Sequence, residues 1–384
     1  MSRAGTNLER ALGIALERGE IGLQVAAYSG QTLVADAWAG LADVEAARPV
    51  TGDTLFVGFA HAKVLTSLAL HLQVERGLLH LDNPVADYWP EFAARGKQDI
   101  TIAQVLAHEC GLPQMPAGVT PELQGDWEWM VAGLAGAEPC HPPGTASAYM
   151  IINQGWILGE VVRRTDPAHR PFGQFVREEV CEPIGAAEAW LGIPAGEEPR
   201  VARTYLPVTP SAAPASGSPP PLAHLAMPAA VAVGPAVYNL PLTHQACNPG
   251  TGALGTARSW ARVMALIANL GELDGVRLLS EETTRTFTRR RANRYEVDLC
   301  LGYVPPVGTA GIWVGGTPQT GLSPSIAFMG GVGGLVWADL ERRVGGAILH
   351  NHVYHAGAPP DPHPLDPVGR AIDDLTRALT RQAT

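Results

Sequence analysis

The residues with the clearest chemical meaning lie between positions 58 and 63, where the sequence is Gly-Phe-Ala-His-Ala-Lys. Apolar residues then recur at helical spacing until a glycine at position 77, so a helix is predicted over 60–76. A lysine one turn after a hydroxyl at a helix start can remove the hydroxyl's proton and create a nucleophile. Lys63 holds the lysine position, but Ala60 stands where the hydroxyl would be. The segment therefore predicts an amine placed for proton transfer, with no nucleophile beside it.

Length and composition exclude several classes of protein. With 384 residues, 46% of them hydrophobic and 17% charged, the chain is expected to be globular, as one large domain or two of ordinary size. A formal net charge of −10 and the lack of a basic stripe argue against a nucleic-acid partner. No apolar run reaches the roughly 18 residues of a membrane span, and segment 1–20 lacks the pattern of a secretion signal. A cytoplasmic location is expected.

The cysteines and histidines do not have the spacing of a metal site. Five cysteines are scattered without a C-x-x-C pair, which favours reduced and mostly buried thiols. The histidines between positions 350 and 363 lie among prolines in a predicted loop. Neither a metal nor a cofactor is expected.

The pattern of elements predicts an α/β fold of the α+β type. Segment 21–43 alternates apolar and polar residues around a Ser-Gly-Gln turn and is predicted to form a hairpin. The other predicted elements are helices over 1–20, 100–108, 126–135, 149–164, 255–269 and 368–382, and strands over 297–304, 325–329, 335–338 and 344–350. We expect an antiparallel sheet flanked by the N- and C-terminal helices, with an inserted, mostly helical region.

Two regions are expected from this pattern. Segments 1–75 and 255–384 would form a discontinuous sheet domain, and segment 76–254 a helical and loop region. The latter includes a Pro/Ala-rich excursion over 206–250, which reads as a surface loop able to fold over a site. The site itself is expected in the seam between the two regions.

Several stretches, in the same order along the chain, resemble the class C β-lactamase-like and penicillin-binding-protein-like serine hydrolases, including their esterase and transacylase branch. They are segments 54–58, the Lys63 helix, 74–85, 99–108, 143–145 with Tyr149, 155–160, 271–275 and 330–334. The resemblance implies a serine β-lactamase-like fold and an acyl-transfer site. In that site a serine attacks an ester or amide carbonyl, the lysine takes its proton, and a tyrosine relays protons.

The resemblance also assigns roles to residues of this chain. The serine, lysine and tyrosine places fall on Ala60, Lys63 and Tyr149, which we take as the candidate catalytic positions. The motif on the strand that walls the site falls on Met329, with Gly331 as its glycine, although the family usually has Lys, His or Trp where Met329 stands. Ala60 lacks a nucleophile and Met329 lacks a donor, so two of the four places have lost their usual chemistry.

The candidate substrate-binding residues follow from the same comparison. The asparagine expected two residues after the tyrosine is Ile151, and Asn153 is a partial substitute. His61 follows Ala60 directly but lies on a different side of the predicted helix. The full candidate set is Met329, Gly330, Gly331, Asn153 and His61.

Three hypotheses about function remain open. In the first, Lys63 and Tyr149 act as an acid/base pair on a small acyl, ester or amide compound of specialised metabolism, without an acyl-serine intermediate. In the second, the protein is a pseudoenzyme that binds such a ligand. In the third, Ala60 replaces the serine of an ordinary esterase, amidase or transacylase. Because loss of the nucleophile costs about 10⁶-fold in turnover in subtilisin, another serine hydrolase, an acyl-serine cycle is excluded. Met329 is a second, independent departure, which favours a natural loss of the nucleophile. The retention of both Lys63 and Tyr149 favours chemistry over ligand binding alone.

Overall fold

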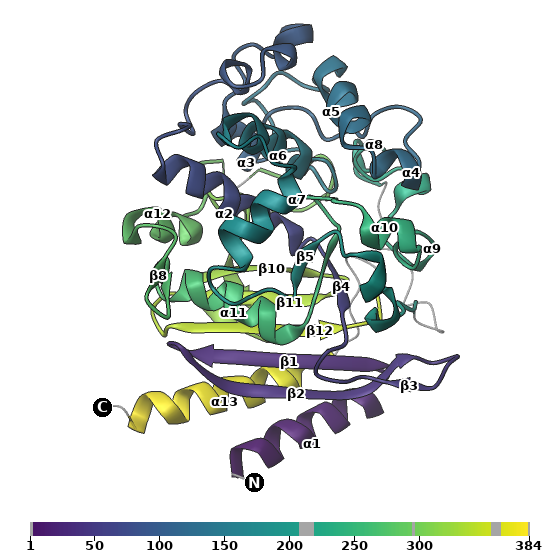
Figure 1. Ribbon diagram of the computed structural model, residues 1–384, viewed down its shortest axis with the longest axis vertical. Coiled ribbons are helices and arrows are strands. Elements are labelled where there is room, and N and C mark those ends of the chain that lie inside the picture. Colours follow the sequence, from purple (N-terminus) through teal and green to yellow (C-terminus); the bar gives the residue numbers. More distant parts are fainter. Residues whose placement is uncertain (1–2, 207–218, 294–295, 355–361, 383–384) are drawn as a thin grey trace.

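The computed structural model describes residues 3–206, 219–293, 296–354 and 362–382. It confirms the predicted fold class: an antiparallel sheet has the N- and C-terminal helices on one face and a largely helical region beyond the other (Figure 1). Both described ends of the chain lie below the sheet in this view. Within the described ranges, no helix has both the length and the apolar character that crossing a membrane requires.

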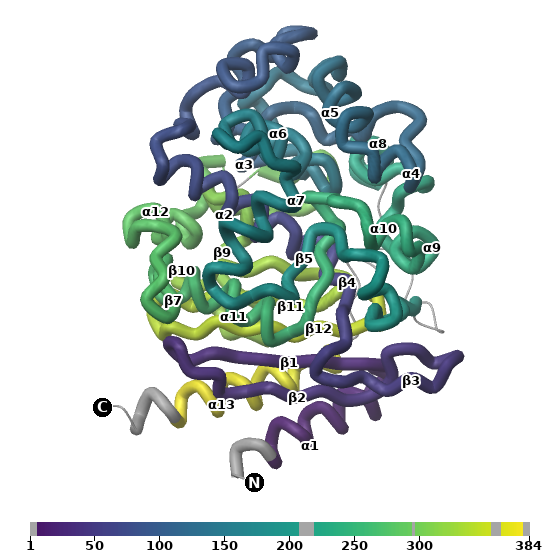
Figure 2. Tube along the Cα trace, in the orientation of Figure 1, coloured from purple at the N-terminus to yellow at the C-terminus, as the bar shows by residue number. Residues whose placement is uncertain are grey.

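The main sheet has seven strands in the order β3-β2-β1-β12-β11-β10-β9. Their bounds are β1 (Gly22–Ser29), β2 (Thr32–Asp43), β3 (Arg48–Pro49), β9 (Trp313–Thr317), β10 (Gly321–Gly331), β11 (Gly334–Asp339) and β12 (Val344–His350). Strands from opposite ends of the chain meet at its centre, where β1 pairs with β12 from Leu23↔His350 to Ser29↔Val344. Figure 2 shows this adjacency as purple tube against yellow-green tube. The predicted hairpin over 21–43 and the strand over 344–350 are confirmed.

Two apolar layers hold the sheet between helices. On the outer face, α1 (Arg3–Glu17) and α13 (Asp366–Gln382) pack their apolar stripes against side chains of β1, β11 and β12. On the inner face, α11 (Ala257–Ala268) crosses β12 and β1. Alternation along the strands separates the layers, because Phe328 belongs to the outer cluster and its neighbour Met329 to the inner one. Side chains on the inner face of the sheet therefore point toward the helical region.

Beyond the inner face of the sheet, the central helix is α2 (Ala62–Glu75), in which every residue from 62 to 73 is buried. A helix that is covered all round belongs to a core, and α2 packs against α6. The remaining helices are α3 (Ile102–Leu106), α4 (Pro121–Gln124), α5 (Trp127–Gly136), α6 (Gln154–Thr165), α7 (Phe172–Phe175), α8 (Ala223–Ala226), α9 (Pro235–Tyr238), α10 (Pro241–Gln245) and α12 (Glu281–Arg285).

Shorter elements complete the fold. A small sheet has the order β4-β6-β5, and β7 pairs with β8. These strands are β4 (Phe56–Phe59), β5 (Ala189–Leu191), β6 (Ala253–Gly255), β7 (Glu272–Leu273) and β8 (Val276–Arg277). The short helical turns are η1 (Val85–Asp87), η2 (Pro90–Gly96), η3 (Val176–Cys181), η4 (Ala195–Arg200), η5 (Ala229–Val231) and η6 (Thr286–Thr288). Most of the predicted Pro/Ala-rich excursion lies either in α8 to α10 or, over 207–218, outside the described residues.

The prediction of a helix over 149–164 is wrong at its start, because α6 begins only at Gln154. The preceding backbone N–H groups are bonded to distant residues. The N–H of Tyr149 donates to Asp298 and that of Met150 donates to His108. Because the N–H groups of Tyr149 and Met150 are bonded to Asp298 and His108, the backbone here is not helical. Helical structure begins only after Asn153, the residue that precedes α6.

The predicted strand over 297–304 is also wrong, because the structure has turns and bends there. The side chain of Asp298 accepts the backbone N–H groups of Cys300 and Leu301 at 2.8 and 3.0 Å. A short carboxylate that bonds its own chain two and three residues ahead folds that chain into a turn. Only the middle of this segment packs near Tyr149, where Cys300 is buried, whereas Val297, Tyr303 and Val304 are exposed.

Close packing of α11 on β12 generates the first prediction. A Cβ on Gly345 would overlap the backbone of Ala265 in α11. We expect Gly345→Ala to lower the free energy of unfolding by about 3 kcal/mol, as overpacking of a core does. Urea unfolding measures the change.

Gly13→Ala in α1 is the matched control, because a Cβ there meets nothing within 4 Å. It should raise stability by about 0.5–1 kcal/mol, since alanine is the better helix former. Equal stability of Gly345→Ala and the wild type would contradict the described packing.

Candidate active site

The site begins at a tight elbow between β4 and α2. Phe59, the last residue of β4, has φ +48°, a left-handed conformation that is rare for a bulky residue. Ala60 follows at the turn and is partly exposed, whereas its neighbours Phe59 and His61 are buried. A Cβ on Gly58 would overlap the imidazole of His61, so only glycine fits there. The elbow thus presents residue 60 at the start of a helix, as the sequence predicts.

Lys63 is the second residue of α2, three positions after Ala60, and is 2% exposed. Its Nζ donates to the backbone carbonyls of Ile151 at 2.7 Å and Gly250 at 2.9 Å. A neutral amine has two N–H groups and one lone pair, so both hydrogens would be occupied and the lone pair left to accept a proton. The lysine predicted to line a site is therefore buried and held by two acceptors.

Burial gives Lys63 the protonation behaviour of a base near neutral pH. Desolvation of the ammonium lowers the pKa of Lys63 from 10.5 to about 7. A group with a pKa close to the working pH is best suited to take a proton during a reaction. Lys63 can serve as a general base here.

Tyr149 lies beside this amine, with Nζ of Lys63 5.7 Å from the centre of its ring. The ring stacks on His108 at 4.0 Å and meets the edge of Trp313 in β9 at 5.9 Å. Tyr149 is 5% exposed, and burial raises the pKa of its phenol above the ordinary value of 10. The phenol therefore keeps its proton at neutral pH. Burial thus lowers the pKa of Lys63 and raises that of its neighbour Tyr149.

The predicted strand motif lies at the end of β10. Met329 is fully buried on the inner face of the sheet and pairs with Val336. Gly331 is exposed with φ +144°, and Gly330 is partly exposed. The turn that follows packs against β4, because a Cβ on Gly333 would overlap the carbonyl of Val57 and the ring of Phe59. The fold thus brings the glycine turn next to the Ala60 elbow, with a thioether where the family has a donor.

The two remaining predicted residues are buried. Asn153 donates to the carbonyls of Leu112 at 2.9 Å and Gln114 at 2.7 Å, so both its N–H groups support the neighbouring loop. His61 packs its ring against the edge of Trp260 at 5.4 Å, and burial lowers its pKa to about 3. Ligand contact by either residue stays a prediction.

Sequence reasoning missed three groups that hold the site together. The Asn248 side chain accepts the N–H groups of Gly250 and Thr251 and so shapes the loop that receives Lys63. Asp298 accepts the N–H of Tyr149, and His108 stacks on its ring. The Asn-Pro-Gly run at 248–250 is a recognisable turn signal, but the partners of His108 and Asp298 lie too far along the chain for any local pattern to find them.

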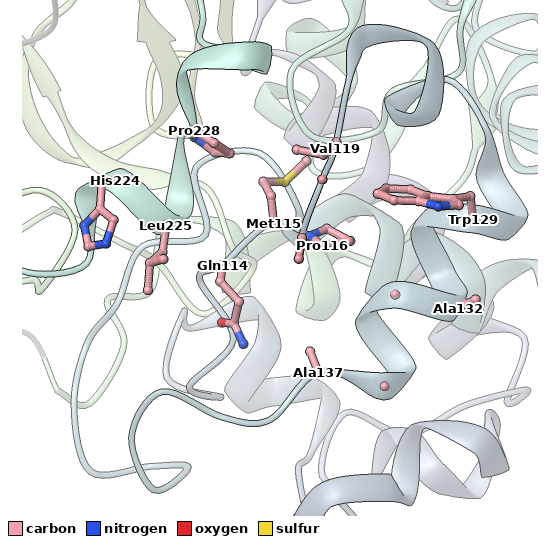
Figure 3. A pocket seen from close by; sticks show the side chains of 14 residues that line it. Gln114, Met115, Pro116, Val119, Trp129, Ala132, Ala137, His224, Leu225 and Pro228 are labelled. Atoms are coloured by element: carbon pink, nitrogen blue, oxygen red, sulfur yellow. The ribbon is translucent and has the colours of Figure 1, made fainter.

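A cavity of about 700 Å³ opens near the site between the loop after Gly111, the helix α5 and the segment around α8 (Figure 3). Trp129, Met115 and Leu225 give it an apolar wall, with Gln114 and His224 at its polar positions. Its lining includes none of Ala60, Lys63 or Tyr149. The carbonyl of Gln114, one of the lining residues, accepts a hydrogen bond from Asn153. The lining is as follows: Gln114, Met115, Pro116, Ala117, Gly118, Val119, Trp129, Ala132, Gly133, Gly136, Ala137, His224, Leu225 and Pro228.

Comparison with known proteins places the chain in a family. The model of the Beta-lactamase family matches residues 7–366, so the chain belongs to that family. It is 31% identical over 339 residues to "Esterase/beta-lactamase LipL" of Mycobacterium tuberculosis (strain ATCC 25618 / H37Rv), which covers 86% of this chain and 76% of that protein.

Solved structures agree with this family. A family VIII carboxylesterase superposes with a TM-score of 0.86 and 29% identity, covering 96% of this chain and 98% of that one. A penicillin-binding protein homolog from Caulobacter crescentus gives a TM-score of 0.85 and 30% identity, covering 97% and 98%. The resemblance stated from the sequence motifs is thereby confirmed.

The buried amine generates the second prediction. Because the pKa of Lys63 is about 7 in the folded protein and near 10.5 when exposed, the unfolded chain binds more protons between these values. The stability that Lys63 contributes must therefore rise with pH in that window. We expect the free energy of unfolding of the wild type, relative to Lys63→Met, to rise by about 1.4 kcal/mol per pH unit between about pH 7 and pH 9. Urea unfolding at several pH values measures it.

Lys97→Met is the control for this measurement. Lys97 is also buried, but against the carbonyls of Ala94, Ala135 and Ala137, away from Lys63, and its pKa is lowered only to about 8. The free energy of unfolding of the wild type relative to Lys97→Met should therefore begin to rise about one pH unit higher, near pH 8. A difference between wild type and Lys63→Met that stays constant with pH would show that the ammonium is not desolvated.

Proposed function

We propose that this protein acts on a small ester or related acyl compound by general acid/base catalysis, without an acyl-enzyme. Lys63 is the base and Tyr149 is the acid. The observation that carries the proposal is the buried Lys63 amine, whose pKa is about 7 and whose Nζ donates to two carbonyls beside a phenol that keeps its proton. A pocket that only binds a neutral ligand gains little from burying such a lysine, because desolvating an ammonium is costly.

The reaction proposed is direct attack of water on the carbonyl. A water molecule in front of Ala60 gives a proton to the lone pair of Lys63 as its oxygen bonds to the carbonyl carbon. The bond from that carbon to the leaving oxygen then breaks, and the phenol of Tyr149 supplies the proton that the leaving alkoxide needs. Proton transfer from the lysine ammonium to the phenolate restores both groups. The products are a carboxylic acid and an alcohol.

The relatives support a small ester as the substrate class. One relative is named an esterase and β-lactamase, and one structural neighbour is titled a family VIII carboxylesterase. Tyr149 packs in one cluster with the buried apolar residues Ala148, Ala226 and Val307.

A second candidate is favoured by the elbow at Phe59. Its left-handed backbone is strained, and such strain persists at functional sites. A serine at position 60 would be presented by this elbow one turn before Lys63. The candidate is therefore an ordinary serine esterase, amidase or transacylase in which alanine has replaced the nucleophile.

The third prediction tests the acid/base pair. With nitrophenyl esters of short acids as probes, Lys63→Ala and Tyr149→Phe should each lower kcat by about 10²-fold or more, the usual contribution of a positioned acid or base. Activity of the parent should rise with pH through about 7, because only the neutral amine of Lys63 accepts a proton.

Lys97→Met serves as the matched control and should keep the parent's rate. Equal turnover in the parent, Lys63→Ala and Tyr149→Phe would remove the acid/base proposal. Binding of the probes without turnover in the parent would instead identify a ligand-binding pseudoenzyme.

The fourth prediction separates the two candidates. Ala60→Ser should become labelled at residue 60 by a fluorophosphonate, whereas the parent should not. Adding Lys63→Met to Ala60→Ser should abolish the labelling, since the serine then lacks its base. Mass spectrometry of the labelled peptide gives the position. If Ala60→Ser is not labelled, the result contradicts the second candidate, a serine hydrolase in which alanine has replaced the nucleophile.

A further inference from the structure

His108 contacts three consecutive residues of the site from one position. It lies just after α3, is fully buried and has φ +60°. Its carbonyl accepts the N–H of Ala148 at 3.0 Å, and its Nδ1 accepts the N–H of Met150 at 3.0 Å. Between these two bonds its ring stacks on Tyr149, with 4.0 Å between ring centres and 30° between planes. One residue thus holds the backbone on both sides of Tyr149 and the face of its ring.

The imidazole of His108 is neutral and does not itself carry a proton to the ligand. Because Nδ1 accepts from Met150, the single ring proton lies on Nε2. The Gln154 amide nitrogen lies 3.2 Å from Nε2, and its two hydrogens are donated to the carbonyls of Val105 and Leu106. Burial lowers the pKa of His108 well below its usual value, and the positive charges of Lys63 and Arg291 lower it further. The charged and titratable groups around this ring and the phenol that it faces are Lys63, Glu109, Arg291, Asp298 and Tyr303.

The backbone conformation of His108 indicates that its side chain matters. A left-handed residue that only turned the chain would be glycine or asparagine, which adopt this conformation at little cost. Histidine is strained there, and neither of the easier residues offers a ring to Tyr149. Asparagine would also supply an acceptor for the N–H of Met150. The contact that only histidine adds is therefore the ring stacked on Tyr149.

We propose that His108 is the positioning residue for Tyr149. Its ring sets the plane of the phenol, and its two backbone bonds fix the segment that carries the phenol, so that the hydroxyl is held toward the ligand beside Lys63. The catalytic consequence rests on the proposed function, but the positioning of the ring does not.

The test separates stacking from backbone support with two substitutions. His108→Asn tolerates the left-handed conformation and keeps an acceptor for Met150 but loses the ring. His108→Phe keeps the ring but loses the acceptor. The protein is labelled with 3-fluorotyrosine, and the ¹⁹F NMR signal of residue 149 is assigned by its disappearance in Tyr149→Phe. Rates on the nitrophenyl ester probes are measured in parallel.

We expect His108→Asn to shift the residue 149 signal and to lower kcat by about tenfold or more, with little change in KM. His108→Phe should keep a signal and a kcat much closer to the wild type, despite its lost hydrogen bond and lower stability. The control is His71→Asn, which removes another buried imidazole, one that packs at a tilt against Phe287 with 5.0 Å between ring centres. It should leave the residue 149 signal and kcat unchanged.

Two results would overturn the proposal. One is an unshifted residue 149 signal in His108→Asn. The other is an equal loss of kcat in His71→Asn, which would mean that general destabilisation explains the effect. Absence of turnover in the wild type would end the proposed function alone, because the NMR comparison still decides whether His108 positions the ring.

Discussion

The contact on which the site depends is the double hydrogen bond from Lys63 to the carbonyls of Ile151 and Gly250. It joins three segments that are far apart in the sequence: the buried helix α2, the stretch before α6 and the loop after Asn248. Nearby, Thr66 donates to the carbonyl of Pro249 at 3.0 Å, so the same loop is fastened to α2 twice. Without a partner, either carbonyl or the amine would be a buried polar group with a substantial energetic cost. The same two hydrogen bonds therefore hold the amine of Lys63 in place and join these segments of the core.

Strained backbone flanks the site on two sides. Phe59 precedes Ala60 in a left-handed conformation, and His108 adopts the same conformation beside Tyr149. Each such residue costs of order 1–3 kcal/mol and persists only where surrounding contacts determine it. At Phe59 the turn after β10 packs on the ring, and at His108 three contacts hold residues 148–150. The fold thus keeps one strained residue directly before Ala60 and another beside Tyr149, each held by surrounding contacts.

Local sequence patterns were sufficient to predict the elements that have a regular apolar periodicity. Alternation predicted the hairpin over 21–43, and helical spacing with a glycine stop predicted α2, within two residues at its start. Local patterns failed where a residue from a distant segment forms hydrogen bonds with the backbone N–H groups. Asp298 and His108 bond the N–H groups of residues 148–150, so α6 starts late, and Asp298 also folds the apolar stretch 297–304 into turns. Lys63 was found by its spacing from Ala60. No spacing reveals His108, since its role depends on contacts with a distant segment, such as the hydrogen bond from Met150, 42 positions away.

The pairing of β1 with β12 has a consequence for how the chain acquires its structure. During synthesis β1 leaves the ribosome long before its central neighbour β12 and stays unpaired on that side until β12 has been made. Meanwhile the backbone N–H and C=O groups along this edge of β1, a strand rich in apolar side chains, can pair with other nascent chains. Folding of this protein should accordingly be slow, late and sensitive to concentration, and cellular chaperones that shield the emerging first strand should raise the yield of native molecules.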